Sequence, residues 1–132
     1  MKTRISRSFK DISLSFNMHP VTKDLTVIKD ANAIAKSVRN IVQTIPKERF
    51  FNSILGSDVR SSLFDLVDIG TASVIEKQIE IAITNFEPRA RLVSVRAFPD
   101  LDRNAYEVSV EFYIVNAPTE LVDFSIMLER LR

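Results

Sequence analysis

A proline-centred joint limits the fold of this chain more than any other feature of its sequence. Residues 85–91 are Asn-Phe-Glu-Pro-Arg-Ala-Arg, and they follow an apolar stretch with helical spacing. Proline strongly disfavours a helical conformation for the residue before it. Residues 92–95, Leu-Val-Ser-Val, are typical of a strand. We therefore predict a helix that ends at this joint, a bend that carries Glu87 and Arg89, and a sheet that starts directly afterwards.

The first helical pattern begins at Asp30, a favourable N-cap residue, and runs to about Ile45, where Pro46 stops it. Its apolar residues recur at helical spacings and are Ile34, Val38, Ile41, Val42 and Ile45. A short strand is expected before it, at residues 24–29. The loop after it, residues 47–57, is expected to pack on the core because it carries Phe50, Phe51, Ile54 and Leu55. Apolar residues at 63–67 predict a short helix or turn beneath the core.

The second helical pattern starts near Thr71 or Ser73 and runs to the joint. Ser73 and Glu76 have the spacing of a capping box, although Thr71 is an equally good cap. One face carries Ala72, Ile75, Ile79, Ala82, Ile83 and Phe86. Val74 and Ile81 widen this apolar face, which predicts burial of the helix on more than one side.

Three strands are expected after the joint. Residues 92–98 form the first, which a turn at residues 99–104 ends. Residues 106–114 alternate most clearly, with Tyr, Val, Val, Phe and Ile on one side. A second turn is expected at residues 116–118, and a period of two at residues 121–131 favours a final strand. The predicted fold is α+β: two long helices packed on a small antiparallel sheet, made of a C-terminal three-stranded meander plus a short N-terminal strand.

Length and charge limit the domain organisation and the location that can be expected for the chain. Its 132 residues are expected to form a single domain, residues 1–132, that buries a sizeable core. Residues 1–10 contain four basic side chains and no acid, and we expect a flexible basic arm there. A net charge of +1 provides no field that would attract nucleic acid. Because no run of about 20 apolar residues is present, no membrane span is expected and the cytoplasm is the default location.

The scarcity of cysteine, glycine and histidine excludes several classes of catalytic and metal-binding site. The chain has no cysteine, which excludes disulfides, thiolate nucleophiles and cysteine metal sites. Two glycines cannot form a glycine-rich phosphate loop, so a nucleotide-binding enzyme is not predicted. His19 is the only histidine, and no Gly-x-Ser-x-Gly elbow accompanies it, so a loop histidine is the better interpretation than a catalytic one. We predict no metal and no cofactor.

Three motifs, taken in order, resemble a known family. Residues 86–89, Phe-Glu-Pro-Arg, resemble the aromatic-Glu-Pro-Arg signature of the small baseplate wedge proteins of contractile phage tails, of the T-even type. That family includes the corresponding subunit of type VI secretion baseplates. Residues 44–49 are similar to the family's Thr-x-x-Gly-Glu-Arg, with Lys47 in place of the glycine. Residues 56–65 are similar to its Gly-Ser-x-Leu-x-x-Leu-Leu-Phe-Asp/Glu, and the resemblance covers about residues 10–131.

The resemblance implies a structural, non-catalytic role. Members sit in the baseplate of the virion tail, which is assembled in the host cytoplasm. They use the Glu-Pro-Arg loop, here Glu87, Pro88 and Arg89, to dock on a helical core bundle of neighbouring wedge proteins. They also act as the platform on which the first ring of tail sheath polymerises, which implies addition of a β-strand to or from the sheath subunit. Nucleic acid and membrane are not implied as partners.

Other interpretations stay open from the sequence. Glu87 and Arg89 are either a docking contact or a local exposed ion pair, worth only ~0–1 kcal/mol. Members of the family have also been described as lysozyme-like, so a cell-wall hydrolase is the alternative function. Glu87, Glu107 and Glu111 are candidate acids for it, although no spacing singles out a catalytic pair. A third interpretation is a free-standing cytoplasmic adaptor with no phage connection.

Overall fold

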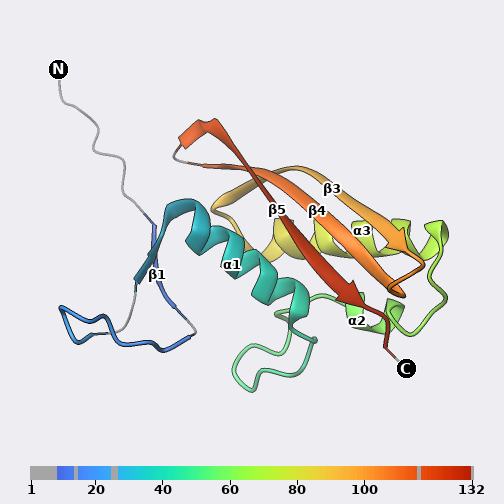
Figure 1. The fold of residues 1–132 in the computed structure, drawn as a ribbon, viewed down its shortest axis with the longest axis horizontal. Helices are drawn as coiled ribbons and strands as arrows, with labels where there is room; N and C mark the ends of the chain where they lie inside the picture. Colours follow the sequence, from blue (N-terminus) through green and yellow to red (C-terminus); the bar gives the residue numbers. More distant parts are fainter. Residues whose placement is uncertain (1–8, 14, 25–26, 116, 132) are drawn as a thin grey trace.

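The computed structural model of the chain describes residues 9–13, 15–24, 27–115 and 117–131. In chain order its elements are β1 (Lys10–Ile12), β2 (Val27–Lys29), α1 (Asp30–Gln43), α2 (Val59–Ser62), α3 (Ile69–Phe86), β3 (Ala90–Asp100), β4 (Ala105–Ile114) and β5 (Ala117–Glu129). The last three strands form an antiparallel sheet in the order β3-β4-β5, and α3 runs behind it in the view of Figure 1. The fold is α+β, as the sequence predicts. No helix within the described residues is long and apolar enough to cross a membrane.

The sheet is a meander whose apolar side faces the helices. In β4 the buried side chains are Tyr106, Val108, Val110, Phe112 and Ile114, whereas Glu107 is exposed. β5 is a strand, as its period of two predicts. β3 extends two residues into the predicted turn, because Pro99 and Asp100 still pair with β4, and the turn is confined to residues 101–104. The other predicted turn is also misplaced, since Ala117 already begins β5.

The short N-terminal strand does not join the meander, contrary to the prediction. β2 instead pairs antiparallel with β1 in a separate two-stranded sheet. Two hydrogen bonds extend this pairing: the Asp30 N–H donates to the Phe9 carbonyl at 2.8 Å, and the Phe9 N–H donates to the Asp30 carboxylate at 3.0 Å. The N-terminal segment therefore supplies the partner that β2 needs. Of the predicted basic arm, residues 1–8 lie outside the described residues, and Lys10 belongs to β1.

The core lies between α1, α3 and the inner side of the sheet. Its side chains with no exposed surface include Ile34, Val38, Ile75, Ile79, Ile83, Tyr106, Val108, Val110 and Phe112. The helical stripes and the alternation in β4 predict all of them. Val74 and Ile81, however, are 50% and 51% exposed. The prediction that α3 is buried on more than one side is therefore wrong, because the sheet and α1 cover one side of it.

The beginning of α3 also differs from the prediction. The helix starts at Ile69, and the N-cap is Asp68, whose carboxylate accepts the Thr71 N–H at 2.6 Å. Ser73 and Glu76 do not form a capping box. The Ser73 hydroxyl donates to the Ile69 carbonyl at 3.1 Å, and Glu76 reaches the sheet instead. The helix thus begins at the favourable N-cap Asp68, upstream of the predicted capping box.

The loop at residues 47–57 does not pack on the core, contrary to the prediction. Its large apolar side chains are exposed, namely Phe50, Phe51 and Ile54, and Leu55 is half-buried. The loop is closed at its base by the Lys47 N–H, which donates to the Ser53 carbonyl at 2.7 Å, and by the Ser57 N–H, which donates to the Thr44 carbonyl at 3.0 Å. These bonds fix the loop so that its apolar tip points away from the core. After α2, residues 63–65 turn as predicted, and Leu63 is buried. Phe64 and Leu66, however, are 54% and 70% exposed, so this segment does not lie beneath the core as a whole, contrary to the prediction.

Candidate functional site

The Glu-Pro-Arg joint is a capped helix end followed by a tight turn. Glu87 is the C-cap of α3, and its N–H donates to the Ile83 carbonyl at 2.9 Å. The Ala90 N–H donates to the Glu87 carbonyl at 3.2 Å, which closes a four-residue turn with Pro88 at its second position, where proline is favoured. The Arg89 carbonyl then accepts the Val115 N–H at 3.0 Å. The predicted bend between helix and sheet is confirmed.

Glu87 and Arg89 form a forked ion pair inside this turn. Arg89 Nε donates to Glu87 Oε1 at 2.7 Å, and Nη2 donates to Oε2 at 2.9 Å. Only 3% of the Glu87 side chain is exposed, against 24% of the Arg89 side chain. Two parallel charge-assisted bonds of this kind are among the strongest that side chains form. The pair is local, but it is not the exposed pair that the sequence had left open.

The surroundings keep Glu87 ionised. Burial by itself raises the pKa of Glu87, but hydrogen bonds from Arg89 and from the Ser37 hydroxyl, together with the charge of Arg89, outweigh it and lower the pKa below its ordinary value. Hydrogen bonding to Glu87 raises the pKa of Arg89 against the effect of burial. Both groups therefore carry their charges at neutral pH. Ser37 lies on α1, so the carboxylate also links the two long helices.

Arg89 extends the joint to the N-terminal hairpin. Its Nη1 donates to both carboxylate oxygens of Asp11 on β1, at 3.2 and 3.1 Å. The guanidinium also lies over the Phe9 ring, 5.6 Å from the centroid, within the range of a cation–π contact. One side chain thus connects the end of α3, the start of β3 and the β1–β2 hairpin.

The three residues predicted to bind a partner therefore have different environments. Glu87 is buried, Arg89 is mostly engaged within the chain, and Pro88 is exposed. Sequence reasoning missed Asp11, Phe9 and Ser37. Asp11 lies 78 positions from Arg89, and no spacing rule connects such residues. The capping-box residue Glu76 was singled out, but for a different role.

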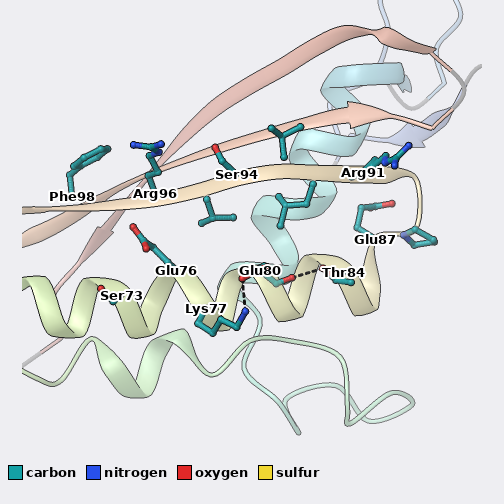
Figure 2. Close-up of a pocket in the computed structure, with 15 residues that line it drawn as sticks. Ser73, Glu76, Lys77, Glu80, Thr84, Glu87, Arg91, Ser94, Arg96 and Phe98 are labelled. Carbon is teal, nitrogen blue, oxygen red and sulfur yellow. Dashed lines mark hydrogen bonds and ion pairs between the residues drawn. The ribbon is translucent and has the colours of Figure 1, made fainter.

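A groove runs from the joint along β3, the first strand of the sheet. It has a volume of about 890 Å³ and lies between the exposed side of α3 and β3 (Figure 2). We call it the β3 groove; its α3 wall includes Glu76, Lys77, Glu80 and Thr84, and its β3 wall is formed by residues 90–96. Glu76 Oε1 accepts the Ala97 N–H of β3 at 2.7 Å. In Figure 2, Arg91, Ser94, Arg96 and Phe98 rise from β3 on the side away from α3.

The candidate acids of a hydrolase do not form a recognisable pair. A glycosidase general acid needs a raised pKa, whereas the pKa of Glu87 is lowered. Glu111 accepts a hydrogen bond from the Ser94 hydroxyl at 2.8 Å, and Glu107 is exposed in β4. Within the part of the chain that the structure describes, no three His, Cys, Asp or Glu side chains are grouped as metal ligands.

Comparison with known proteins identifies the family that the three sequence motifs resemble, and the matched residues include all three motifs. The sequence model of the family described as "Baseplate wedge protein gp25" matches residues 29–119. The chain belongs to this gp25 family. The gp25 baseplate wedge protein of Enterobacteria phage T4 is 27% identical over 124 residues, which cover 94% of this chain and 93% of the T4 protein. The chain is thus a baseplate wedge protein of a contractile phage tail.

Solved structures share the fold of this chain. A protein of Geobacter sulfurreducens, provisionally named a tail lysozyme, matches with a TM-score of 0.73 and 24% identity, over 81% of this chain and 97% of its own. A chain of the anti-feeding prophage baseplate matches with a TM-score of 0.65 and 18% identity, over 95% and 88%. A chain of the type VI secretion baseplate complex matches with a TM-score of 0.63 and 15% identity, over 76% and 93%. At these identities the likeness shows the fold alone.

Proposed function

We propose that this chain is a non-catalytic wedge subunit that docks on neighbouring wedge proteins at the Glu-Pro-Arg joint and starts sheath polymerisation by β-strand addition. In this proposal the assembly takes place in the host cytoplasm. The observation that carries the proposal is the edge strand β3, which has eleven residues, pairs with β4 on one side and borders the β3 groove on the other. Long edges of this kind are normally protected, because they bind other strands. A subunit that initiates assembly needs such an edge.

The joint supports docking through its rigidity. The forked Glu87–Arg89 pair and the turn hydrogen bond hold Pro88 outward at the end of α3. Because the two charges are already paired, a partner meets a preformed surface that includes Pro88 and the exposed parts of Arg89 and Asp11. A preformed loop loses little conformational entropy on binding, which favours affinity. In this proposal the ion pair positions the loop, and Pro88 makes the contact.

The ionised state of Glu87 supports a non-catalytic role. The hydrolase alternative requires a protonated acid near neutral pH. Glu87 is held ionised by Arg89 and Ser37, so it does not meet this requirement. The Geobacter protein is named a tail lysozyme, so the hydrolase alternative needs a direct test.

Incubation of purified chain with peptidoglycan is expected to release no soluble fragments. Release that disappears on substitution of Glu107 or Glu111 would contradict the proposal.

Docking is tested with Pro88→Lys, which places a long charged side chain at the exposed tip of the joint. The fold is expected to stay within about 1 kcal/mol of wild type, because exposed substitutions usually change stability by about 0.5 kcal/mol or less and loss of the proline's fixed φ adds a similar amount. Capture of the wedge partners by the variant is expected to weaken tenfold or more. Pro20→Lys, at another exposed proline, is the matched control and is expected to bind normally. Equal capture by both variants would contradict docking at the joint.

Sheath initiation is tested by reconstitution. Baseplates assembled without this chain are expected to form no sheath ring when sheath subunit is added, and wild-type chain is expected to restore ring formation, as counted by electron microscopy. Baseplates that nucleate sheath equally well without the chain would contradict the proposal.

A further inference from the structure

A second depression lies beside the joint, between the N-terminal hairpin and the first helix. It has a volume of about 430 Å³ and is lined by Lys10, Asp11 and Ile12 of β1 and by Ala33, Lys36, Ser37 and Asn40 of α1. We call it the β1–α1 cleft; β1 lies next to the start of α1 in Figure 1. The four α1 residues follow one another at helical spacings, which places them on one face of the helix. One strand and one helix face therefore form the lining.

The β1–α1 cleft and the Glu-Pro-Arg joint share two residues. Asp11 lines the cleft, and both of its carboxylate oxygens accept from Arg89 Nη1, at 3.2 and 3.1 Å. Ser37 also lines the cleft, and its hydroxyl donates to the buried carboxylate of Glu87. The cleft is thus continuous with the surface that the proposed function assigns to docking.

The two lysines of the cleft have no acidic partner within the part of the chain that the structure describes. Lys10 is exposed and Lys36 is half-buried, and neither forms an ion pair with another described residue. The acid of the cleft, Asp11, is already paired with Arg89. Complementary charge across an interface speeds association and discriminates between partners. The cleft therefore favours a carboxylate from another molecule.

The other groups in the cleft favour a protein segment over a simple anion. The side-chain amide of Asn40 can both donate and accept hydrogen bonds, and the carboxylate of Asp11 can accept a further N–H. Ile12 is 56% exposed and adds apolar surface at the same place. A phosphate would be attracted by the lysines but repelled by Asp11. A peptide segment with one acidic side chain makes use of all these groups, because its charge and its N–H groups occupy different positions.

We infer that the β1–α1 cleft binds an acidic segment of a neighbouring wedge protein, and that Lys10 and Lys36 select this partner by its carboxylate. The inference rests on the proposed function, and it adds a second contact surface and the chemistry of the segment that fits there. The partner contacts β1 and α1 in addition to Pro88, so the N-terminal hairpin is part of the docking surface.

Charge reversal in the cleft tests the selection of an acidic partner. Lys10→Glu/Lys36→Glu places like charges opposite the partner's carboxylate and is expected to capture co-expressed wedge proteins at least tenfold more weakly than wild type. Lys23→Glu/Arg60→Glu has the same net charge, carries its changes at exposed positions outside the cleft, and is expected to capture them normally. Thermal midpoints show that both double variants fold. Equal capture by the two would overturn the inference.

Zero-length cross-linking detects the contact without a change that could disturb the fold. A carbodiimide joins a lysine amine to a touching carboxylate as an amide, with net loss of water. In the wild-type complex, mass spectrometry is expected to find Lys10 or Lys36 joined to an Asp or Glu of a wedge protein. Lys10→Arg/Lys36→Arg keeps the charges and removes the amines, so it is expected to keep capture and lose these cross-links. Wild-type complex in which neither lysine is cross-linked would overturn the inference.

A titration with inorganic phosphate separates a protein site from a simple anion site. Phosphate at millimolar concentration is expected to leave the amide signals of residues 33–40 unchanged in the nuclear magnetic resonance spectrum. Saturable shifts of these signals that Lys10→Glu/Lys36→Glu abolishes would show a small-anion site and overturn the assignment to a protein segment.

The failures of the two proposals are distinguishable. If wild-type chain captures no wedge protein, the proposed docking and the role of the cleft are both overturned. If Pro88→Lys weakens capture while Lys10→Glu/Lys36→Glu does not, only the role of the cleft is wrong. If the charge-reversed variant alone loses capture, the cleft is confirmed as the contact and docking through Pro88 is wrong.

Discussion

Glu87 loses nearly all contact with solvent when the chain folds, and its carboxylate is stabilised by Arg89 and Ser37 instead. This changes the energetics of the joint. An exposed ion pair contributes little, but removal of one partner from a buried pair leaves an uncompensated charge. The sequence predicted correctly that both residues lie at the bend after α3. It did not reveal their burial, because burial depends on α1 and on the N-terminal hairpin.

Arg89→Ala is therefore expected to lower the free energy of unfolding by about 3 kcal/mol, because Glu87 would remain buried without its partner. From sequence alone, the same substitution would be expected to leave the fold unchanged. Arg91→Ala, at an exposed arginine two positions along β3, is the control and is expected to stay within about 0.5 kcal/mol. Urea denaturation measures both, and equal midpoints for the two variants would show that the pair is energetically a surface pair.

The lowered pKa of Glu87 makes a prediction about pH. A carboxyl group whose pKa is lower in the folded state adds stability that is present above its ordinary pKa, 4.5, and is lost as the pH falls through the folded value. The stability advantage of wild type over Glu87→Gln is thus expected to be constant near neutral pH and to shrink below about pH 4.5. Denaturant titrations between pH 7 and pH 3 measure it. An advantage that grows toward low pH would have the wrong sign.

Lys47 stands where the family motif Thr-x-x-Gly-Glu-Arg has a glycine, and its backbone adopts a conformation that favours glycine. Its φ is 74°, in the left-handed region that favours glycine. Lys47→Gly is expected to stabilise the fold by about 1 kcal/mol, the cost of that conformation for a residue with a side chain. Lys77→Gly, inside α3, is expected to destabilise by about 1 kcal/mol. Thermal midpoints that move in the same direction for both variants would contradict this.

At the scale of elements, the spacing of apolar residues was sufficient to predict a helix or strand that is buried on one side only. The stripe in α1, the core face of α3 and the alternation in β4 follow from burial on one side, which the spacing of apolar residues records. The errors lie where two local signals compete. Asp68 replaced Ser73 as the cap of α3, and β2 found its partner in β1 rather than in the meander. Neither choice is encoded in periodicity.

The loop at residues 47–57 shows why apolar content alone does not predict packing. Phe50 and Phe51 are 99% and 105% exposed at the tip of a loop whose base is closed by hydrogen bonds. Exposed aromatic pairs of this kind mark interaction surfaces in proteins that act in assemblies. We therefore expect that a neighbouring baseplate protein covers them in the assembled tail.

The double variant Phe50→Ser/Phe51→Ser is accordingly expected to keep the thermal midpoint of wild type, because the two rings contact little of the folded chain. Its solubility is expected to rise, and its incorporation into baseplates to fall severalfold. Ile79→Ala, in the core, is the contrasting variant and is expected to lose ~2–5 kcal/mol. A large fall in the midpoint of the double variant would show that the loop packs on the chain after all.

At the scale of the whole molecule, the joint is the place where three parts of the chain meet. The end of α3, the start of β3 and the β1–β2 hairpin are held together by one guanidinium. The sequence predicted the joint and its resemblance to a wedge-protein signature, and the family assignment agrees with both. It could not predict Asp11 as a partner, since pairing across 78 positions is a result of the fold.

Asp11→Asn tests how this hairpin is attached. The Arg89–Asp11 pair is partly exposed, at 24% and 36% of the side chains, so it is expected to contribute at most about 1 kcal/mol. A two-stranded hairpin has little stability of its own, and that amount is a large share of what holds it to the domain. Amides of β1 are therefore expected to exchange up to about fivefold faster in the variant, whereas amides of β4 keep their protection. Asp123→Asn, at an exposed position of β5, is the control and is expected to change neither set. Unchanged exchange in β1 would mean that Phe9 and Asp30 alone hold the hairpin, and faster exchange in β4 would mean that the hairpin is part of the cooperative core.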